Sequence, residues 1–125
     1  MPIEEPRIWK RSMPGPEYEK KLKAINEAYT ASLPVALNDI ASLWDELLAE
    51  WDDTRAAALS DNCHRLAGSA SMFGHAEIGR IACSIEDIFG KVVHKGQLLT
   101  EEEIASIGRY VDELRTLARR LPDSP

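Results

Sequence analysis

The stretch "LSDNCHRLAGSASMFGHAEIGRIACSIEDIF", residues 59–89, carries the clearest structural pattern in this chain. Apolar residues recur every three or four positions on both sides of Gly74, which is the spacing of a buried helix face. Gly74 is a typical helix C-terminus, and His75 or Ala76 opens the next segment. The stretch therefore predicts two amphipathic helices joined by a tight turn. Their inward residues are expected to be Leu59, Cys63, Leu66, Ala70 and Phe73, then Ile78, Ile81, Ala82, Ile85, Ile88 and Phe89, with Arg80, Glu86 and Asp87 mostly outward.

A similar apolar stripe precedes this stretch. It consists of Tyr18, Leu22, Ile25, Tyr29, Leu33, Leu37, Ile40, Trp44, Leu47 and Trp51. Pro34 interrupts the stripe, which predicts either a kink or a break into two helices. Asp52 or Asp53 then follows as the expected N-cap of the helix that contains Leu59.

The sequence "TEEE" predicts a capping box at the start of the last helix, in which Thr100 caps the helix and the Glu103 side chain reaches back to Thr100. Its apolar face is expected to consist of Ile104, Ile107, Val111, Leu114, Leu117 and Leu121. Pro122 stops it, and the preceding loop is built around Gly96. No segment alternates with the period of two that strands show. The chain is therefore predicted to be all-α, an up-and-down antiparallel four-helix bundle with an additional N-terminal helical segment.

The 125 residues suit one domain with flanking segments. Residues 1–16 hold four of the seven prolines and are predicted to form an extended arm, residues 17–121 the bundle, and residues 122–125 a short tail. Ile8 and Trp9 would let the arm dock on the body, and a mobile tail is the alternative.

Composition excludes several classes of protein. The net charge of −6 argues against a nucleic-acid partner, and no apolar run approaches the roughly 20 residues that span a bilayer. The N-terminus has acids and prolines in place of a signal peptide, so a cytoplasmic protein without a membrane partner is expected. Cys63 and Cys83 are expected to be reduced core residues, because no CxxC or HxxxH pattern accompanies them. A monomer is expected because packing within a single bundle is expected to bury the apolar stripes of the helices.

His64 is predicted to point outward, because it lies about 140° from the centre of the apolar stripe on its own helix. Its neighbours on that face are Ser60, Ala67, Gly68 and Ser71, all of them small. Most exposed helix faces carry long side chains that lie across their neighbours. The imidazole is therefore expected to stand above a shallow clearing.

An exposed neutral imidazole has a free lone pair and can serve as a nucleophile, a base or a metal ligand. A metal site is not expected, because Gly68 occupies the i+4 position and no acidic cluster shares the face. A single helix surface also lacks the pocket and oxyanion hole of a hydrolase. Two interpretations of His64 remain. It is either a nucleophile that a partner protein must approach or an incidental surface histidine. His75 and His94, near helix ends, are expected to be ordinary surface or capping residues.

The stretch "CHRLAGSASMFG" followed by "EIGRIACSIED" resembles the histidine phosphotransfer (HPt) family of two-component phosphorelays. The matching positions are His64, Leu66, Gly68, Ser69, Ala70, Gly74 and the pair Ile85–Glu86. The resemblance implies that His64 is phosphorylated and exchanges the phosphoryl group with receiver-domain aspartates or a hybrid histidine kinase. It implies a phosphocarrier rather than a self-sufficient enzyme, with no cofactor of its own and with Mg²⁺ supplied by the receiver.

One position departs from the family pattern. Many members have a lysine three residues after the histidine, where this chain has Ala67. Arg65 and Arg80 are the candidates for neutralising the phosphoryl oxygens in its place. Gly68 is expected to be retained for the clearance that a docking receiver needs. The alternative function is a helical interaction protein that docks on a receiver without being phosphorylated.

Overall fold

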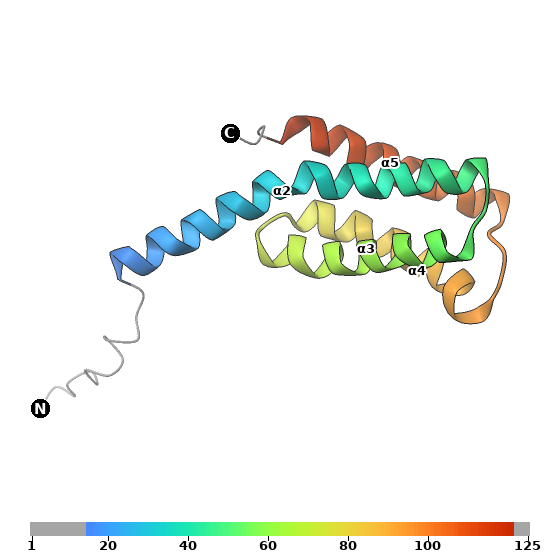
Figure 1. Ribbon diagram of the computed structural model, residues 1–125, viewed down its shortest axis with the longest axis horizontal. Helices are drawn as coiled ribbons and strands as arrows, with labels where there is room; N and C mark the ends of the chain where they lie inside the picture. Colours follow the sequence, from blue (N-terminus) through green and yellow to red (C-terminus); the bar gives the residue numbers. More distant parts are fainter. Residues whose placement is uncertain (1–14, 122–125) are drawn as a thin grey trace, which may run out of the picture.

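The structure is a computed structural model that describes residues 15–121. Its helices are α2 (Pro16–Ala49), α3 (Asp53–Met72), α4 (Ala76–Lys95) and α5 (Glu101–Arg120), and this part of the chain contains no strand. α2 packs against α3 and α5, and α4 packs against the same two helices. Short connections make chain neighbours antiparallel, and the four helices close around one core (Figure 1). The predicted all-α four-helix bundle is confirmed.

α2 is longer than the bundle. It runs without a break through Pro34 for 34 residues, so of the two predicted alternatives the break into two helices is wrong. Figure 1 shows a bend between the blue and cyan parts of this helix, and the blue part extends past the end of the bundle. The additional N-terminal helical segment is therefore the first half of α2.

The extension of α2 leaves apolar side chains in solvent. Tyr18, Leu22 and Ile25 are 52%, 43% and 52% exposed, because the first part of α2 extends past the other described helices (Figure 1). The stripe becomes buried only from Leu33 onward. The assumption that one bundle uses every apolar stripe is thus wrong for this segment, and the monomeric state that rested on it stays a prediction.

Aromatic residues fill the end of the core near the α2–α3 connection. Phe89 is fully buried, with Trp44 edge-on at a centroid distance of 6.0 Å and Trp51 stacked at 6.3 Å. Trp51 itself remains 38% exposed. Phe73 and Ile88 are half-buried at the margin of the core rather than inside it.

Cys83 corrects the prediction of two buried cysteines. Cys63 is buried in α3 and Cys83 is exposed on α4, and both are free thiols. Counting about 100° per residue, Cys83 lies about 140° from the line through Ile78, Ile85 and Phe89 that faces the core. It therefore belongs to the outer surface.

The predicted helix ends are formed as expected. The Asp52 side chain accepts hydrogen bonds from the Thr54 and Arg55 amides, and the Thr100–Glu103 capping box is complete. Gly74 has φ of 86°, a left-handed conformation that glycine adopts without steric cost, and it turns the chain from α3 into α4.

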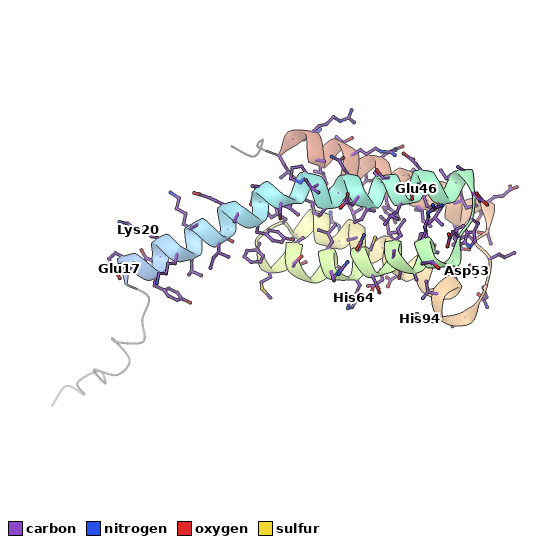
Figure 2. All side chains as sticks on the ribbon, in the orientation of Figure 1. Glu17, Lys20, Glu46, Asp53, His64 and His94 are labelled. Carbon is purple, nitrogen blue, oxygen red and sulfur yellow. The ribbon has the colours of Figure 1, made fainter. Side chains whose placement is uncertain are left out.

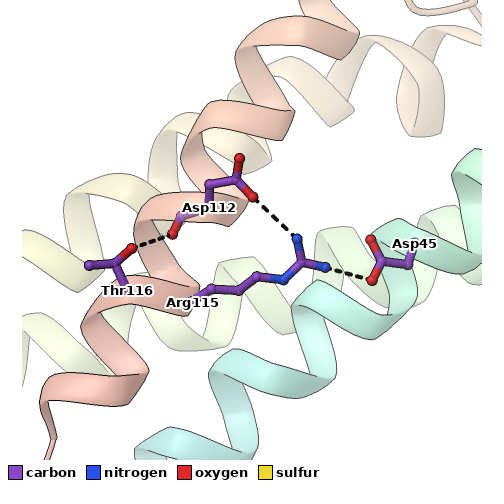
Figure 3. Close-up of polar contacts among 4 residues, drawn as sticks. All are labelled: Asp45, Asp112, Arg115 and Thr116. Atoms are coloured by element: carbon purple, nitrogen blue, oxygen red, sulfur yellow. Dashed lines mark hydrogen bonds and ion pairs between the residues drawn. The ribbon is translucent and has the colours of Figure 1, made fainter.

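Polar contacts fix α2 to its neighbours. Figure 3 shows Arg115 of α5 donating to Asp45 of α2 at 2.5 Å and to Asp112 at 3.2 Å. The hydrogen bond to Asp45 raises the pKa of Arg115 above its ordinary value. Because these side chains are partly exposed, the ion pairs contribute little to the stability of the bundle.

The residues that the structure describes include only part of the predicted arm, bundle and tail. The first described helix begins at Pro16, next to the proposed start of the bundle at residue 17. Residues 1–14 of the arm, with Ile8 and Trp9, and the tail at 122–125 lie outside the described residues. The division stays a prediction.

Candidate functional site

His64 stands near the middle of α3, on the side of the bundle that faces away from the core (Figure 2). Its side chain is 73% exposed, while Cys63 before it and Leu66 after it are buried. The helical period that buries those two residues turns His64 outward, as the sequence predicts.

Glu86 of α4 binds the imidazole from the side. Its Oε2 lies 2.5 Å from Nδ1 of His64, and its side chain is 28% exposed. An ionised carboxylate only accepts hydrogen bonds, so Nδ1 is the donor and carries the ring proton. In the neutral ring Nε2 then holds the lone pair.

The contact with Glu86 was not foreseen from helical periodicity, which placed this residue mostly outward. Glu86 lies about 80° from the centre of the inward face of α4, at the margin where α3 packs. Its position in the family pattern, directly after Ile85, was the available signal.

The clearing around His64 is narrower than predicted. Gly68 and Ser71 are exposed, as expected, and a Cβ at Gly68 would meet no atom within 4 Å. Ser60 is instead buried at 8% exposure and Ala67 is half-buried. Both lie about 80–100° from the inward face of α3, on the side that α4 covers.

Gly79 allows α4 to approach α3 closely beside the site. A Cβ at Gly79 would overlap Ser71 Oγ and would lie 3.1 Å from the carbonyl oxygen of Ala67. The Ser71 hydroxyl donates to the same Ala67 carbonyl at 3.0 Å. The helices that carry His64 and Glu86 are therefore in close contact at Gly79.

The two arginines proposed for phosphoryl neutralisation do not contact His64 in the structure. Arg65 donates to Asn62 of its own helix and lines a groove with Tyr29 and Asp39 of α2. Arg80 is exposed on α4, six residues before Glu86, which is about 9 Å along the helix axis. Their role in neutralisation stays a prediction.

The buried thiol beneath the site is chemically quiet. Burial, with a smaller contribution from the Glu86 charge, raises the pKa of Cys63 to about 12. A thiol with that pKa stays protonated near neutral pH, so it does not compete with His64 as a nucleophile.

The other two histidines lie apart from His64. His75 is the N-cap residue of α4, and its Nε2 is 3.1 Å from Thr30 Oγ1 of α2. His94 is exposed in the last turn of α4 (Figure 2). Within residues 15–121, no group of three or more His, Cys, Asp or Glu side chains is arranged to hold a metal ion. None of the described helices is long and apolar enough to cross a membrane.

Comparison with known proteins agrees with this geometry. The family description "Hpt domain" matches residues 23–121, which is most of the chain. The chain belongs to the Hpt domain family. The resemblance predicted from the sequence is therefore confirmed, and membership assigns the chain to histidine phosphotransfer in phosphorelays, as a phosphocarrier that interacts with receiver domains and kinases. No curated protein and no solved structure gives a significant match.

Proposed function

We propose that this Hpt domain relays a phosphoryl group between receiver-domain aspartates, or between a kinase and a response regulator, through a phosphohistidine at His64. The observation that carries the proposal is the pairing of an exposed imidazole with a carboxylate on its Nδ1. The carboxylate fixes the tautomer, so a single nitrogen, Nε2, is presented to the partner.

The proposed reaction needs little from this chain beyond the nucleophile. Nε2 attacks the phosphorus of an aspartyl phosphate in line, and the aspartate carboxylate leaves as a phosphoramidate forms on His64. The receiver supplies Mg²⁺ and the groups that neutralise charge, so the chain itself requires no cofactor in this scheme. A cytoplasmic location is part of the same proposal, because soluble receivers are the partners.

Docking requires the surface beside His64 to be free of long side chains, and Gly68 is the residue that supports this. It lies one turn after His64, and the space above it is open. Gly68→Gln is expected to fold normally and to slow transfer from a phosphorylated receiver by at least about 10-fold, while Gly68→Ala transfers at nearly the wild-type rate. Equal transfer by the Gln and Ala variants would show that clearance is not needed at this position.

The decisive experiment is phosphotransfer from a phosphorylated receiver to wild type and to His64→Gln. Because His64 is 73% exposed, the Gln variant is expected to give the wild-type circular dichroism spectrum and to accept no phosphate. Acid-labile, alkali-stable phosphate on the wild type alone supports the proposal. Phosphate on both proteins would place the site elsewhere, and receiver binding without any phosphate would favour the alternative of an interaction protein.

A further inference from the structure

The contact between Glu86 and His64 constrains the ring after phosphorylation. When Nε2 gives its lone pair to phosphorus, the aspartyl O–P bond breaks and its electron pair returns to the carboxylate. The histidine ring then carries a positive charge and still holds the Nδ1 proton. Loss of that proton would leave Nδ1 as a bare acceptor beside Glu86 Oε2, which is also an acceptor, at 2.5 Å. The carboxylate therefore favours the protonated ring.

The surrounding charges do not oppose this effect. The positions one turn from His64 or Glu86 carry no lysine or arginine; they are Ser60, Asp61, Ala67, Gly68, Ala82, Cys83, Phe89 and Gly90. Arg65 donates to Asn62 of its own helix and lines a groove that Asp39 of α2 also lines. The exposed titratable side chains of α4 from residue 80 onward, besides the half-buried Glu86, are Arg80, Cys83, Asp87, Lys91, His94 and Lys95, and Lys91 is paired with Glu103 of α5 at 2.9 Å. Among the residues described, Glu86 is thus the charged group in contact with the ring.

We propose that Glu86 keeps the Nδ1 proton on His64 while the phosphoryl group is bound, so that the group is held as a phosphoimidazolium. This inference rests on the proposed function. Glu86 acts here as a positioning residue, since it touches the ring and not the phosphorus.

The consequence is a carrier arranged to pass its phosphoryl group on rather than to store it. In the next transfer the N–P bond breaks and its electron pair returns to Nε2, while a receiver carboxylate forms the new O–P bond. The imidazole leaves as a neutral molecule because Nδ1 already holds its proton. No proton has to move in either direction of the transfer.

The test is the lifetime of the phosphohistidine measured between pH 5 and pH 8. The protein is phosphorylated with phosphoramidate, whose P–N bond breaks to release ammonia, and the excess reagent is removed. The proteins compared are wild type, Glu86→Gln and the matched control Asp87→Asn, which removes one exposed charge from the same helix.

A glutamine at position 86 keeps the shape of the side chain but does not select the proton, since its amide accepts from a protonated Nδ1 or donates to a bare one. At pH 8 the Gln variant is expected to hold its phosphate about 10-fold longer than wild type, the equivalent of one pH unit in ring protonation. At pH 5, where both rings are protonated, the two lifetimes are expected to agree. Asp87→Asn is expected to follow wild type throughout.

The outcomes separate this inference from the proposed function. If His64 takes up phosphate from neither phosphoramidate nor a phosphorylated receiver, the proposed function itself fails. If it takes up phosphate and the wild-type and Gln lifetimes agree at pH 8, the role of Glu86 is overturned and the proposed function stands. An equal change at pH 5 and pH 8 would also overturn it, because it would reflect a structural effect without proton selection.

Discussion

Replacing Gly79 with alanine is expected to destabilise the bundle, although the same change favours helix formation by about 1 kcal/mol. The new Cβ would overlap Ser71 Oγ and lie 3.1 Å from the Ala67 carbonyl oxygen. The Ser71 hydroxyl can rotate away, which breaks its 3.0 Å hydrogen bond to Ala67 and costs about 1 kcal/mol. The carbonyl belongs to the backbone of α3 and cannot move alone.

The remaining contact must be relieved by moving α4 away from α3. Overpacking of this kind costs about 1–3 kcal/mol. Together with the lost hydrogen bond and set against the gain in helix propensity, this gives an expected net loss of about 1–3 kcal/mol in the free energy of unfolding. For a domain of this size, that corresponds to a melting temperature lower by about 5–15 °C.

Gly68→Ala is the matched control, because it makes the same chemical change in the neighbouring helix where a Cβ meets nothing within 4 Å. It is expected to stabilise the protein by about 0.5–1 kcal/mol. Urea unfolding followed by far-ultraviolet circular dichroism compares the two variants with wild type. A Gly79→Ala protein that unfolds at the wild-type urea concentration or above would refute the argument from close approach.

Two further predictions concern reactivity and pH. Cys83 is exposed and is expected to react with a thiol reagent at once in the folded protein, whereas the buried Cys63, whose pKa is raised to about 12, reacts only on unfolding; immediate reaction of two thiols would contradict this assignment. A hydrogen bond from the Thr100 backbone lowers the pKa of Glu103 below its ordinary value of 4.5, and a hydrogen bond from the Lys91 side chain lowers it further. The resulting stabilisation is complete above about pH 4.5 and is lost as the pH falls through the lowered pKa, so Glu103→Gln is expected to flatten the dependence of unfolding free energy on acid pH; an unchanged slope would rule out the linkage.

Local features of the fold followed directly from the sequence. Asp52 and Thr100 cap their helices as predicted, because capping depends on residues within one turn of each other. His64 points outward for a similar reason, since its direction is set by the period of its own helix. The family pattern in residues 64–86 added the chemistry that periodicity does not provide.

Features that depend on a second helix were not accessible in the same way. Periodicity assigned Tyr18 to a buried stripe. Burial requires a neighbouring helix, however, and α2 extends beyond the ends of the helices that it packs against. The predicted exposure of Cys83 and Ser60 was wrong. Whether each residue is exposed depends on which side of its helix is covered by the neighbouring helix.

The functional site shows the same distinction between features set within one helix and features set by the packing of two. The sequence by itself determined a helical bundle with one outward histidine and a glycine one turn after it, because these follow from the spacing of residues along one helix. Only the tertiary structure decided that Glu86 holds Nδ1 of that histidine, and that Gly79 rather than Gly68 is the glycine without room for a side chain. The physical reason is that both depend on the rotation and separation of α3 and α4, which the packing of the whole bundle sets and which no local spacing records.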